Sequence, residues 1–270
     1  MVGDFKTRPD KAMGYAACEG AEKNNYQDGN FGAGTGASVG KLGDKSLCMK
    51  GGIGSYAVQI GDLKVGAIVA VNARGDIYDW KDGKKVAGLL NADRKTFADT
   101  EEAVYKSYEV IKNKFTGATE NTTIGAVITN AAFPKSSLCK IAGMAHDGYA
   151  RAIRPVHTSS DGDSIYALSV GDVKADQDMV GTLGAQVMAE AILRAVRSAE
   201  SAYGLVGAKD LKKRRKQSGS PATLCRSGSR FFYTVTSGLS RAGTDQAPSQ
   251  APLKFRAHLI GNGSYGAGKR

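Results

Sequence analysis

A junction near the middle of the chain constrains both its folding and its chemistry. Residues 112–120 are mostly polar, whereas residues 123–129 are rich in β-branched and small apolar side chains, which predicts a buried strand. Asn121 and Thr122 stand at the boundary. A threonine hydroxyl becomes a nucleophile when a base lies beside it, and a free α-amino group, with a pKa of about 8, can be that base. A chain cut between Asn121 and Thr122 would carry such a nucleophile, although these residues alone favour an ordinary loop that leads into a strand.

The composition is typical of a globular, water-soluble domain. The chain has 270 residues, of which 41% are hydrophobic and 23% charged, and this suits one large domain with a sizeable core. No apolar run approaches the roughly 20 residues that span a bilayer, and no signal peptide is recognisable. The 4 cysteines form no CxxC pair, which argues against a zinc site and a disulfide framework. We therefore expect a cytoplasmic protein with reduced thiols and no membrane partner.

The net charge of +11 is confined to one end of the chain. Residues 211–270 hold twelve Lys or Arg residues and one acid, so the preceding 210 residues are neutral. The basic run at 212–216 could attract phosphates. Because the segment around it lacks sustained periodicity, we expect residues 213–270 to form a disordered, basic, low-complexity tail and expect no specific nucleic-acid partner.

Periodicity predicts the secondary structure of the remaining chain. Helices are expected at residues 13–21, from Asp99, from a cap at Ser136 or Ser137 to Pro155, and at 176–201, and strands at 53–60, 64–72, 123–129 and 164–170. Gly61 and Asp62 join the first two strands in a hairpin. Residues 65–71 are apolar throughout, which predicts burial on both faces. Antiparallel strand pairs with helices grouped around them indicate an α+β fold.

Several separated motifs agree in order and spacing with one family. These are Gly32–Ala37 with Gly40 and Lys41, Met49–Ser55, Met144–Gly148, Arg154–Thr158 and Ser160–Asp163. Together with Asn121 and Thr122 they closely resemble the DmpA/NylC family of L-aminopeptidase/D-esterases, β-aminopeptidases and nylon-oligomer hydrolases. Members of this family are made as one chain and cleave themselves before a Ser or Thr that becomes the N-terminal nucleophile. The resemblance runs from about residue 3 to about residue 212.

The resemblance sharpens the expected architecture. It implies a four-layer αββα sandwich of the DmpA/ornithine-acetyltransferase type. It also implies that the chain is incomplete at its N-terminus, because residues 1–11 correspond to a stretch well inside the family's chain. Residues 1–121 would then be the remainder of an α-subunit part, and residues 122–212 a β-subunit part of the same domain. The family assembles as homo-oligomers of cleaved α/β pairs.

The resemblance also assigns the chemistry. Thr122 is the expected nucleophile, freed by cleavage of the Asn121–Thr122 bond. Asp161 and Asp163 match the acidic pair of the nylon-oligomer hydrolases, where the aminopeptidases have Ser and Glu. Two carboxylates this close disfavour double ionisation, so one can orient Thr122 while the other handles a proton or a substrate ammonium. The alternative is a solvated Asp-Gly-Asp turn.

Two further residues match pocket positions of the family. Asn72 ends a predicted strand and could donate to a developing oxyanion, or it could simply begin a turn. Lys41 resembles the pocket lysine of the nylon-hydrolase branch, or it is a surface lysine. His146 and His157 fit no metal-binding spacing and are treated as structural by the resemblance. No metal or organic cofactor is implied.

The resulting hypothesis is a self-processing N-terminal-threonine amide hydrolase or aminopeptidase. Its expected substrates are small peptides, amino-acid amides or esters, or amino-acid-like oligomers. One alternative is an inactive truncated fragment of that family. Another is an acyltransferase like the ornithine acetyltransferases, whose cleavage motif differs from the residues around Asn121.

Overall fold

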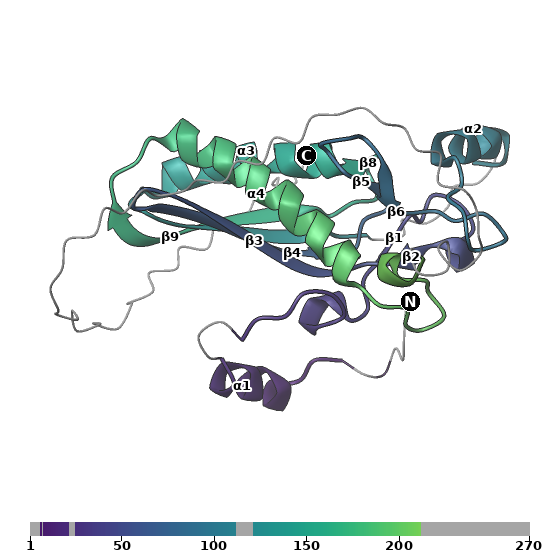
Figure 1. Ribbon diagram of the computed structural model, residues 1–270, viewed down its shortest axis with the longest axis horizontal. Coiled ribbons are helices and arrows are strands. Elements are labelled where there is room, and N and C mark those ends of the chain that lie inside the picture. The colour runs from purple at the N-terminus through teal and green to yellow at the C-terminus, as the bar shows by residue number, and fades with distance from the viewer. Residues whose placement is uncertain (1–5, 7, 22–24, 112–120, 212–270) are drawn as a thin grey trace, which may run out of the picture.

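A four-stranded sheet in the order β3–β4–β7–β9 forms the centre of the structure (Figure 1). Its strands are β3 Gly52–Ile60, β4 Leu63–Val71, β7 Ile124–Ala131 and β9 Ser164–Val173. The structure is a computed structural model and describes residues 6, 8–21, 25–111 and 121–211. The predicted tail at 213–270 lies outside the described residues.

The first two strands form the predicted hairpin. β3 and β4 pair antiparallel in an unbroken register from Gly52 opposite Val71 to Ile60 opposite Leu63. Gly61 occupies the turn with φ of 56°, a left-handed conformation that glycine adopts without steric cost. The local sequence pattern is therefore sufficient to place this element.

The last two strands of the sheet are parallel, and the prediction of antiparallel pairs is wrong for them. β7 pairs with β9 from Ile124 opposite Ser164 onwards, in the same direction. The reason is the helix α3, Lys135–Ala152, which connects them across one face of the sheet. A chain that returns through such a crossover helix re-enters the sheet in the direction in which it left.

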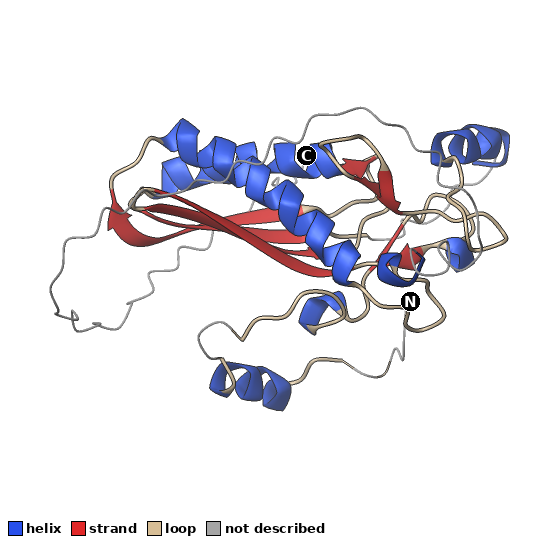
Figure 2. Cartoon of the chain, in the orientation of Figure 1, coloured by secondary structure: helices blue, strands red, loops and turns tan. Residues whose placement is uncertain are grey.

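Two long helices cover one face of the sheet (Figure 2). These are α3 and α4, the latter Gln177–Ser198. The predicted core stripe of α3 is buried in full: Leu138, Ile141, Ala142, Ala145 and Tyr149. The expected serine cap of α3 is wrong, because its N-cap is Pro134, without a side-chain hydrogen bond. The expectation that no apolar run approaches the length of a membrane span is wrong for α4, which by length and composition could cross a membrane, but 72% of its apolar window is buried, as in a core helix.

A glycine allows α4 to lie directly on β3. A Cβ at Gly54 would stand 2.2 Å from the carbonyl oxygen of Ala191 and 2.4 Å from the nitrogen of Ala195. Neither backbone atom can move without displacing the helix. The backbone of α4 therefore approaches the sheet more closely than any side chain at Gly54 would permit.

On the opposite face of the sheet, apolar side chains stay partly exposed among the described residues, which contradicts the prediction that residues 65–71 are buried on both faces. Val65, Ala67, Val69 and Val71 face the helices and are buried. On the other face Ile68, Ile124 and Ile128 are 37%, 50% and 36% exposed. Within the described ranges the protein thus has one helical layer and one large sheet. The predicted α+β class is confirmed.

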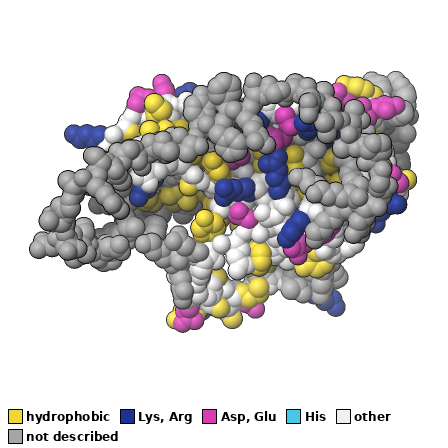
Figure 3. Space-filling model, in the orientation of Figure 1, with side chains coloured by type: hydrophobic (Ala, Val, Ile, Leu, Met, Phe, Trp, Pro, Cys, Tyr) yellow, Lys and Arg dark blue, Asp and Glu magenta, His cyan; other side chains and the backbone are white. Residues whose placement is uncertain are grey.

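The remaining elements lie outside the central sheet and its two covering helices. They are α1 Lys11–Glu19, η1 Gly32–Gly34, β1 Ser38–Val39, η2 Lys45–Leu47, β2 Met49–Lys50, β5 Asp76–Tyr78, β6 Lys85–Ala87, α2 Thr100–Ile111 and β8 Ile153–Arg154. β1 pairs with β2, and β5 lies between β6 and β8. On the surface seen in Figure 3, Lys and Arg side chains are intermixed with Asp and Glu, in keeping with the neutral balance of this part of the chain.

A buried lysine, Lys50, holds the loop that contains Gly34 and Ala37 in place. Lys50 is fully buried, and its Nζ donates to the carbonyl oxygens of Gly34, Ala37 and Gly51 at 2.6, 3.0 and 3.0 Å. Burial lowers the pKa of Lys50 to about 8. The loop that carries Ser38 and Lys41 is thereby tied to the sheet.

Candidate active site at the Asn121–Thr122 junction

The parallel pairing of β7 and β9 continues beyond the strands into the junction. Asn121 forms an isolated parallel bridge with Asp161, in the same register as Ile124 with Ser164. The N–H of Asn121 donates to the carbonyl of Ser160 at 3.0 Å, and the N–H of Gly162 donates to the carbonyl of Asn121 at 2.7 Å. The register of the sheet therefore places the Asp-Gly-Asp segment beside the junction.

Thr122 is half-buried and faces this segment. A Cβ at Gly162 would lie 2.9 Å from Thr122 Oγ1 and 3.8 Å from the carbonyl oxygen of Asn121. The hydroxyl of Thr122 and the carbonyl before it thus both lie on the side of Gly162 where a side chain would project. The absence of a side chain at Gly162 leaves room for the Thr122 hydroxyl.

Asp163 holds the backbone that follows Thr122. Its Oδ1 accepts from the N–H of Thr123 at 3.0 Å, and its Oδ2 lies 3.0 Å from Nδ1 of His157. The side chain of Asp163 is 5% exposed. The alternative of a solvated Asp-Gly-Asp turn is therefore wrong for Asp163.

Asp161 has one satisfied and one unsatisfied oxygen. Its Oδ2 accepts from the N–H of Thr158 at 3.0 Å and from the hydroxyl of Thr158 at 2.6 Å. Its Oδ1 is buried and has no hydrogen-bond partner among the described residues. A buried carboxylate oxygen without a donor is costly, and nearby positive charge such as that of Lys41, which interacts electrostatically with Asp161, offsets part of this cost.

Lys41 and Asn72 meet the junction from the other side. The Nζ of Lys41 donates to Asn72 Oδ1 at 2.6 Å, to the carbonyl of Asn72 at 3.1 Å and to Asn121 Oδ1 at 3.1 Å. Burial lowers the pKa of Lys41 to about 8, opposed by the charges of Cys48 and Asp161. The alternative of a surface lysine is therefore wrong.

The local fold explains why Lys41 reaches inward. The N–H groups of Gly40 and Lys41 donate to the carbonyls of Gly75 and Arg74 at 3.0 and 2.8 Å. Gly40 has φ of 77°, and a Cβ there would stand 2.2 Å from the backbone of Gly88. Only glycine fits at this crowded position, and its bend directs the next side chain toward Asn72.

Asn72 is oriented by two donors. Its Oδ1 accepts from Lys41 and, at 3.2 Å, from the N–H of Ser38. With the oxygen engaged in this way, the amide nitrogen of Asn72 is the atom available to donate to a substrate. All six predicted site residues, Lys41, Asn72, Asn121, Thr122, Asp161 and Asp163, therefore gather at one end of the sheet.

Three further residues contact the junction without having been predicted as site residues. His157 contacts Asp163, Gly162 contacts Asn121, and Tyr149 OH donates to the carbonyls of Thr123 and Ser164 at 3.3 and 3.2 Å. Burial, and then the charge of Asp163, raise the pKa of Tyr149. Tyr149 fits the core stripe of its helix, so the pattern gives no separate signal for its hydroxyl. The short separation between His157 and Asp163 in the sequence is the one available signal for their contact.

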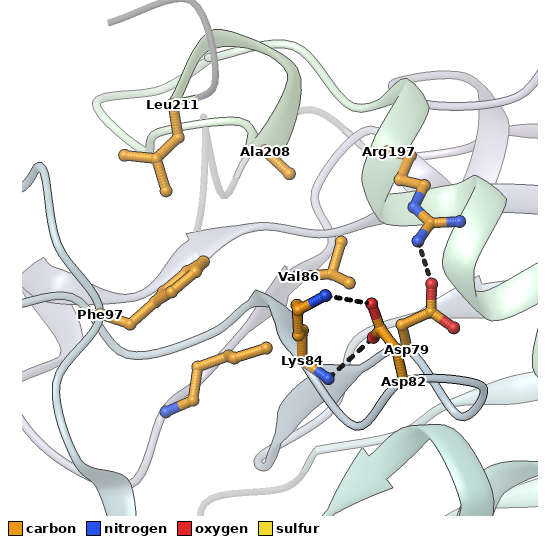
Figure 4. A pocket seen from close by; sticks show the side chains of 9 residues that line it. Asp79, Asp82, Lys84, Val86, Phe97, Arg197, Ala208 and Leu211 are labelled. Carbon is orange, nitrogen blue, oxygen red and sulfur yellow. Dashed lines mark hydrogen bonds and ion pairs between the residues drawn. The ribbon is translucent and has the colours of Figure 1, made fainter. Parts of the chain in front are cut away.

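A separate cavity of about 210 Å³ lies away from the junction (Figure 4). Two ion pairs lie among the charged side chains that line it: Arg197 with Asp79 at 2.5 Å and Lys84 with Asp82 at 2.8 Å. Phe97, Val86, Ala208 and Leu211 form its apolar wall. No predicted site residue lines this cavity.

Comparison with known proteins agrees with this geometry. The sequence profile of Peptidase family S58 matches residues 1–210. The chain is 33% identical over 227 residues to a Mycobacterium leprae (strain TN) protein named as an uncharacterized aminopeptidase, covering 76% of this chain and 60% of that protein. It is 31% identical over 215 residues to a 6-aminohexanoate-oligomer endohydrolase of Paenarthrobacter ureafaciens, covering 72% of this chain and 59% of that protein. The chain thus spans about three-fifths of the length of these relatives.

A solved structure supports the fold assignment. The L-aminopeptidase D-Ala-esterase/amidase from Ochrobactrum anthropi, described as a variant of the Ntn hydrolase fold, superposes with a TM-score of 0.51 at 20% identity, covering 77% of this chain and 57% of that chain. The family resemblance inferred from the motifs is confirmed. The chain belongs to Peptidase family S58, a family of hydrolases.

Proposed function

We propose that the chain cleaves its own Asn121–Thr122 bond and that Thr122 then hydrolyses amide or ester bonds of small amino-acid-like substrates. The observation that carries this proposal is the position of the Asn121 carbonyl. Its oxygen accepts a 2.7 Å hydrogen bond from Gly162, and the Thr122 hydroxyl lies against the same glycine. A donor aimed at a carbonyl oxygen stabilises the negative charge that develops there during attack.

The self-cleavage begins as an N-to-O acyl shift. Thr122 Oγ1 attacks the carbonyl carbon of Asn121, the C–N bond breaks, and the hydroxyl proton passes to the departing nitrogen. Water then hydrolyses the resulting ester, which leaves a carboxylate on Asn121 and a free hydroxyl and α-amine on Thr122. Asp163 holds the N–H of Thr123 at 3.0 Å during these steps and so limits movement of the nucleophile.

Hydrolysis of a substrate repeats the same attack on a foreign carbonyl. The α-amine of Thr122 takes the hydroxyl proton as the acyl group transfers, and water then releases the acid. Asn72 donates to the oxyanion from its amide nitrogen, and the 2.6 Å contact of Lys41 Nζ with its carbonyl oxygen supports this role. The unpaired Oδ1 of Asp161 accepts an ammonium group of the substrate.

The proposed contact of Asp161 with a substrate ammonium group and the names of the related proteins indicate the substrate class. The names of these relatives specify an aminopeptidase and a 6-aminohexanoate-oligomer endohydrolase, and both names denote hydrolysis of amide bonds. We infer that this chain acts on peptides, amino-acid amides or esters, or aminohexanoate oligomers. We further propose a cytoplasmic homo-oligomer of cleaved pairs, as expected from the family.

Intact mass spectrometry and N-terminal sequencing of the purified chain test self-cleavage. We expect a fragment that begins at Thr122, lost in Thr122→Ala and retained in Thr122→Ser, whose hydroxyl can still attack. Thr123→Val is the matched control, because the buried Thr123 Oγ1 has no hydrogen-bond partner among the described residues. A single uncleaved wild-type chain would contradict the proposal and favour an inactive fragment.

Substrate hydrolysis is tested separately on the cleaved protein. Leucine, alanine and β-alanine p-nitroanilides and aminohexanoate oligomers cover the proposed class. Hydrolysis that disappears in Thr122→Ala supports the assignment. Cleaved protein that turns over none of these, but transfers an acetyl group between amino acids, would instead indicate the acyltransferase alternative.

A further inference from the structure

His157 lies outside the residues that the proposed chemistry uses, yet it contacts one of them directly. Its Nδ1 stands 3.0 Å from Asp163 Oδ2, while the other oxygen of Asp163 accepts from the N–H of Thr123. The carboxylate therefore links the imidazole to the backbone immediately after Thr122. Since Asp163 is almost fully buried, these contacts rather than solvent determine its orientation.

The imidazole of His157 is itself held in place by helix α3. His146 Nδ1 lies 3.3 Å from His157 Nε2, with ring centroids 4.9 Å apart. The ring of Tyr149 stacks on His157 at 6.0 Å between centroids and 29° between planes. The titratable groups around this pair are Asp163, Tyr149 and Asp147, which follows His146 on α3.

The contact between the two histidines restricts their protonation. With both rings neutral, both contacts are satisfied by one arrangement of the ring protons: His146 Nδ1–H points toward His157 Nε2, and His157 Nδ1–H points toward Asp163. One added proton is compatible with both contacts. His157 then carries a hydrogen on each ring nitrogen, and its Nε2–H donates to His146 Nδ1 while its Nδ1–H still points toward Asp163. A second proton would place two N–H groups face to face at 3.3 Å, and the contact would break.

We propose that His157 is a positioning residue for the Thr122 site, which orients Asp163 and thereby the backbone of the nucleophile, and that its pairing with His146 makes self-cleavage sensitive to acid. The inference rests on the proposed self-cleavage. It predicts that double protonation of the pair releases His157 from its place against α3, so that Asp163 loses its partner and the reaction slows. Burial and the neighbouring His157 lower the pKa of His146, so the second proton enters only on the acid side of neutrality.

The backbone at His157 suggests the decisive variant. Its φ is 55°, a conformation that asparagine tolerates well and alanine does not. The amide nitrogen of asparagine also reaches the position of Nδ1 and donates a hydrogen bond, but it does not titrate. His157→Asn therefore keeps the contact to Asp163 and removes the pH dependence, while His157→Ala removes both.

The experiment follows self-cleavage of the full chain, made by cell-free translation and stopped at timed points, between about pH 5 and 8, where histidine titrates. We expect His157→Ala to slow cleavage roughly 10- to 100-fold, by analogy with the loss found when a group that orients a metal ligand is removed. His157→Asn should recover much of that loss and should lack the acid-side fall in rate that the wild type shows. His146→Ala should keep most of the rate at neutral pH and displace the acid-side fall.

Each outcome separates two hypotheses. Equal rates for wild type and His157→Ala would overturn the positioning role, and an unchanged acid-side fall in His157→Asn would overturn the acid sensitivity of the histidine pair, while self-cleavage stands in both cases. A folded wild-type chain that never cleaves would overturn self-cleavage, and the positioning role with it. Thermal unfolding of each variant shows whether a slow rate reflects a partly unfolded chain, and His157→Asn remains the test if His157→Ala fails to fold.

Discussion

The backbone N–H of Gly162 donates a 2.7 Å hydrogen bond to the carbonyl oxygen of Asn121, the group that Thr122 must attack in self-cleavage. These two residues lie on different strand ends and are brought together by the parallel register of β7 and β9. The contact polarises the carbonyl before any reaction takes place. A hydrogen bond that is already formed requires no reorganisation when charge develops.

The first prediction concerns the space beside this hydrogen bond. In Gly162→Ala the new methyl group would meet Thr122 Oγ1 at 2.9 Å and displace the hydroxyl. Displacement of a reacting atom by about 1 Å can cost about 100-fold in rate, so we expect self-cleavage to slow by up to that factor. Timed gel electrophoresis of freshly translated chain measures it.

Gly143→Ala is the control for this change. Gly143 lies on α3, and a Cβ there has no neighbour within 4 Å. We expect its cleavage rate to equal that of the wild type. Unimpaired cleavage in Gly162→Ala would show that the Thr122 hydroxyl does not react from its position against Gly162.

The second prediction is a loss of self-cleavage above about pH 8. The pKa of Lys41 is about 8, below the ordinary value of 10.5, so the amine loses its proton as the pH rises through about 8. The neutral amine binds Asn72 and Asn121 more weakly, and the rate should fall. Before cleavage Thr122 has no free amine, so titration of Thr122 cannot cause this fall in rate above about pH 8.

Substitution of Lys41 identifies the group whose titration causes the fall in rate near pH 8. In Lys41→Arg the guanidinium stays charged throughout this range, so the fall in rate near pH 8 should disappear even if the rate itself is lower. Lys41→Met should be slow at every pH. If the rate of Lys41→Arg still falls near pH 8, the fall is caused by titration of a group other than Lys41.

The third prediction concerns recognition of a substrate ammonium by Asp161. Asp161→Asn keeps an oxygen for Thr158 but removes the charge from the unpaired side of the group. A hydrogen bond to a charged group contributes about 1.5–3 kcal/mol, so we expect KM for amino-acid p-nitroanilides to rise roughly 10- to 100-fold. Steady-state kinetics with N-acetylated analogues provide the comparison, because these lack the ammonium group and should be affected far less. Equal losses for both kinds of substrate would argue against ammonium binding.

The fourth prediction concerns the contact between α4 and β3. Gly54→Val places a side chain where the backbone of Ala191 and Ala195 already lies, and should reduce the free energy of unfolding by about 1–3 kcal/mol or more. Gly14→Ala is the contrasting change: no atom lies within 4 Å of its Cβ, and Gly14 is in an exposed helix. Alanine there should stabilise the chain by up to about 1 kcal/mol. Urea unfolding of both variants tests the pair.

The sequence alone determined the elements whose causes are local. The β-branched run after Asn121, the Gly61 hairpin and the apolar stripe of α3 follow from the periodicity of neighbouring residues, and the structure confirms each. The motifs also indicated the family, because several separated short segments agree with it in order and spacing.

Tertiary structure alone decided how these elements meet. The parallel register of β7 and β9 depends on the path of α3, and it is this register that sets Gly162 and Asp163 against Asn121 and Thr123. The burial of Lys41 and the contact of His157 with Asp163 likewise join separate segments. Periodicity reports which face of an element is apolar, whereas register, burial and hydrogen-bond partners depend on segments that are distant in the sequence, and these non-local contacts assemble the candidate site.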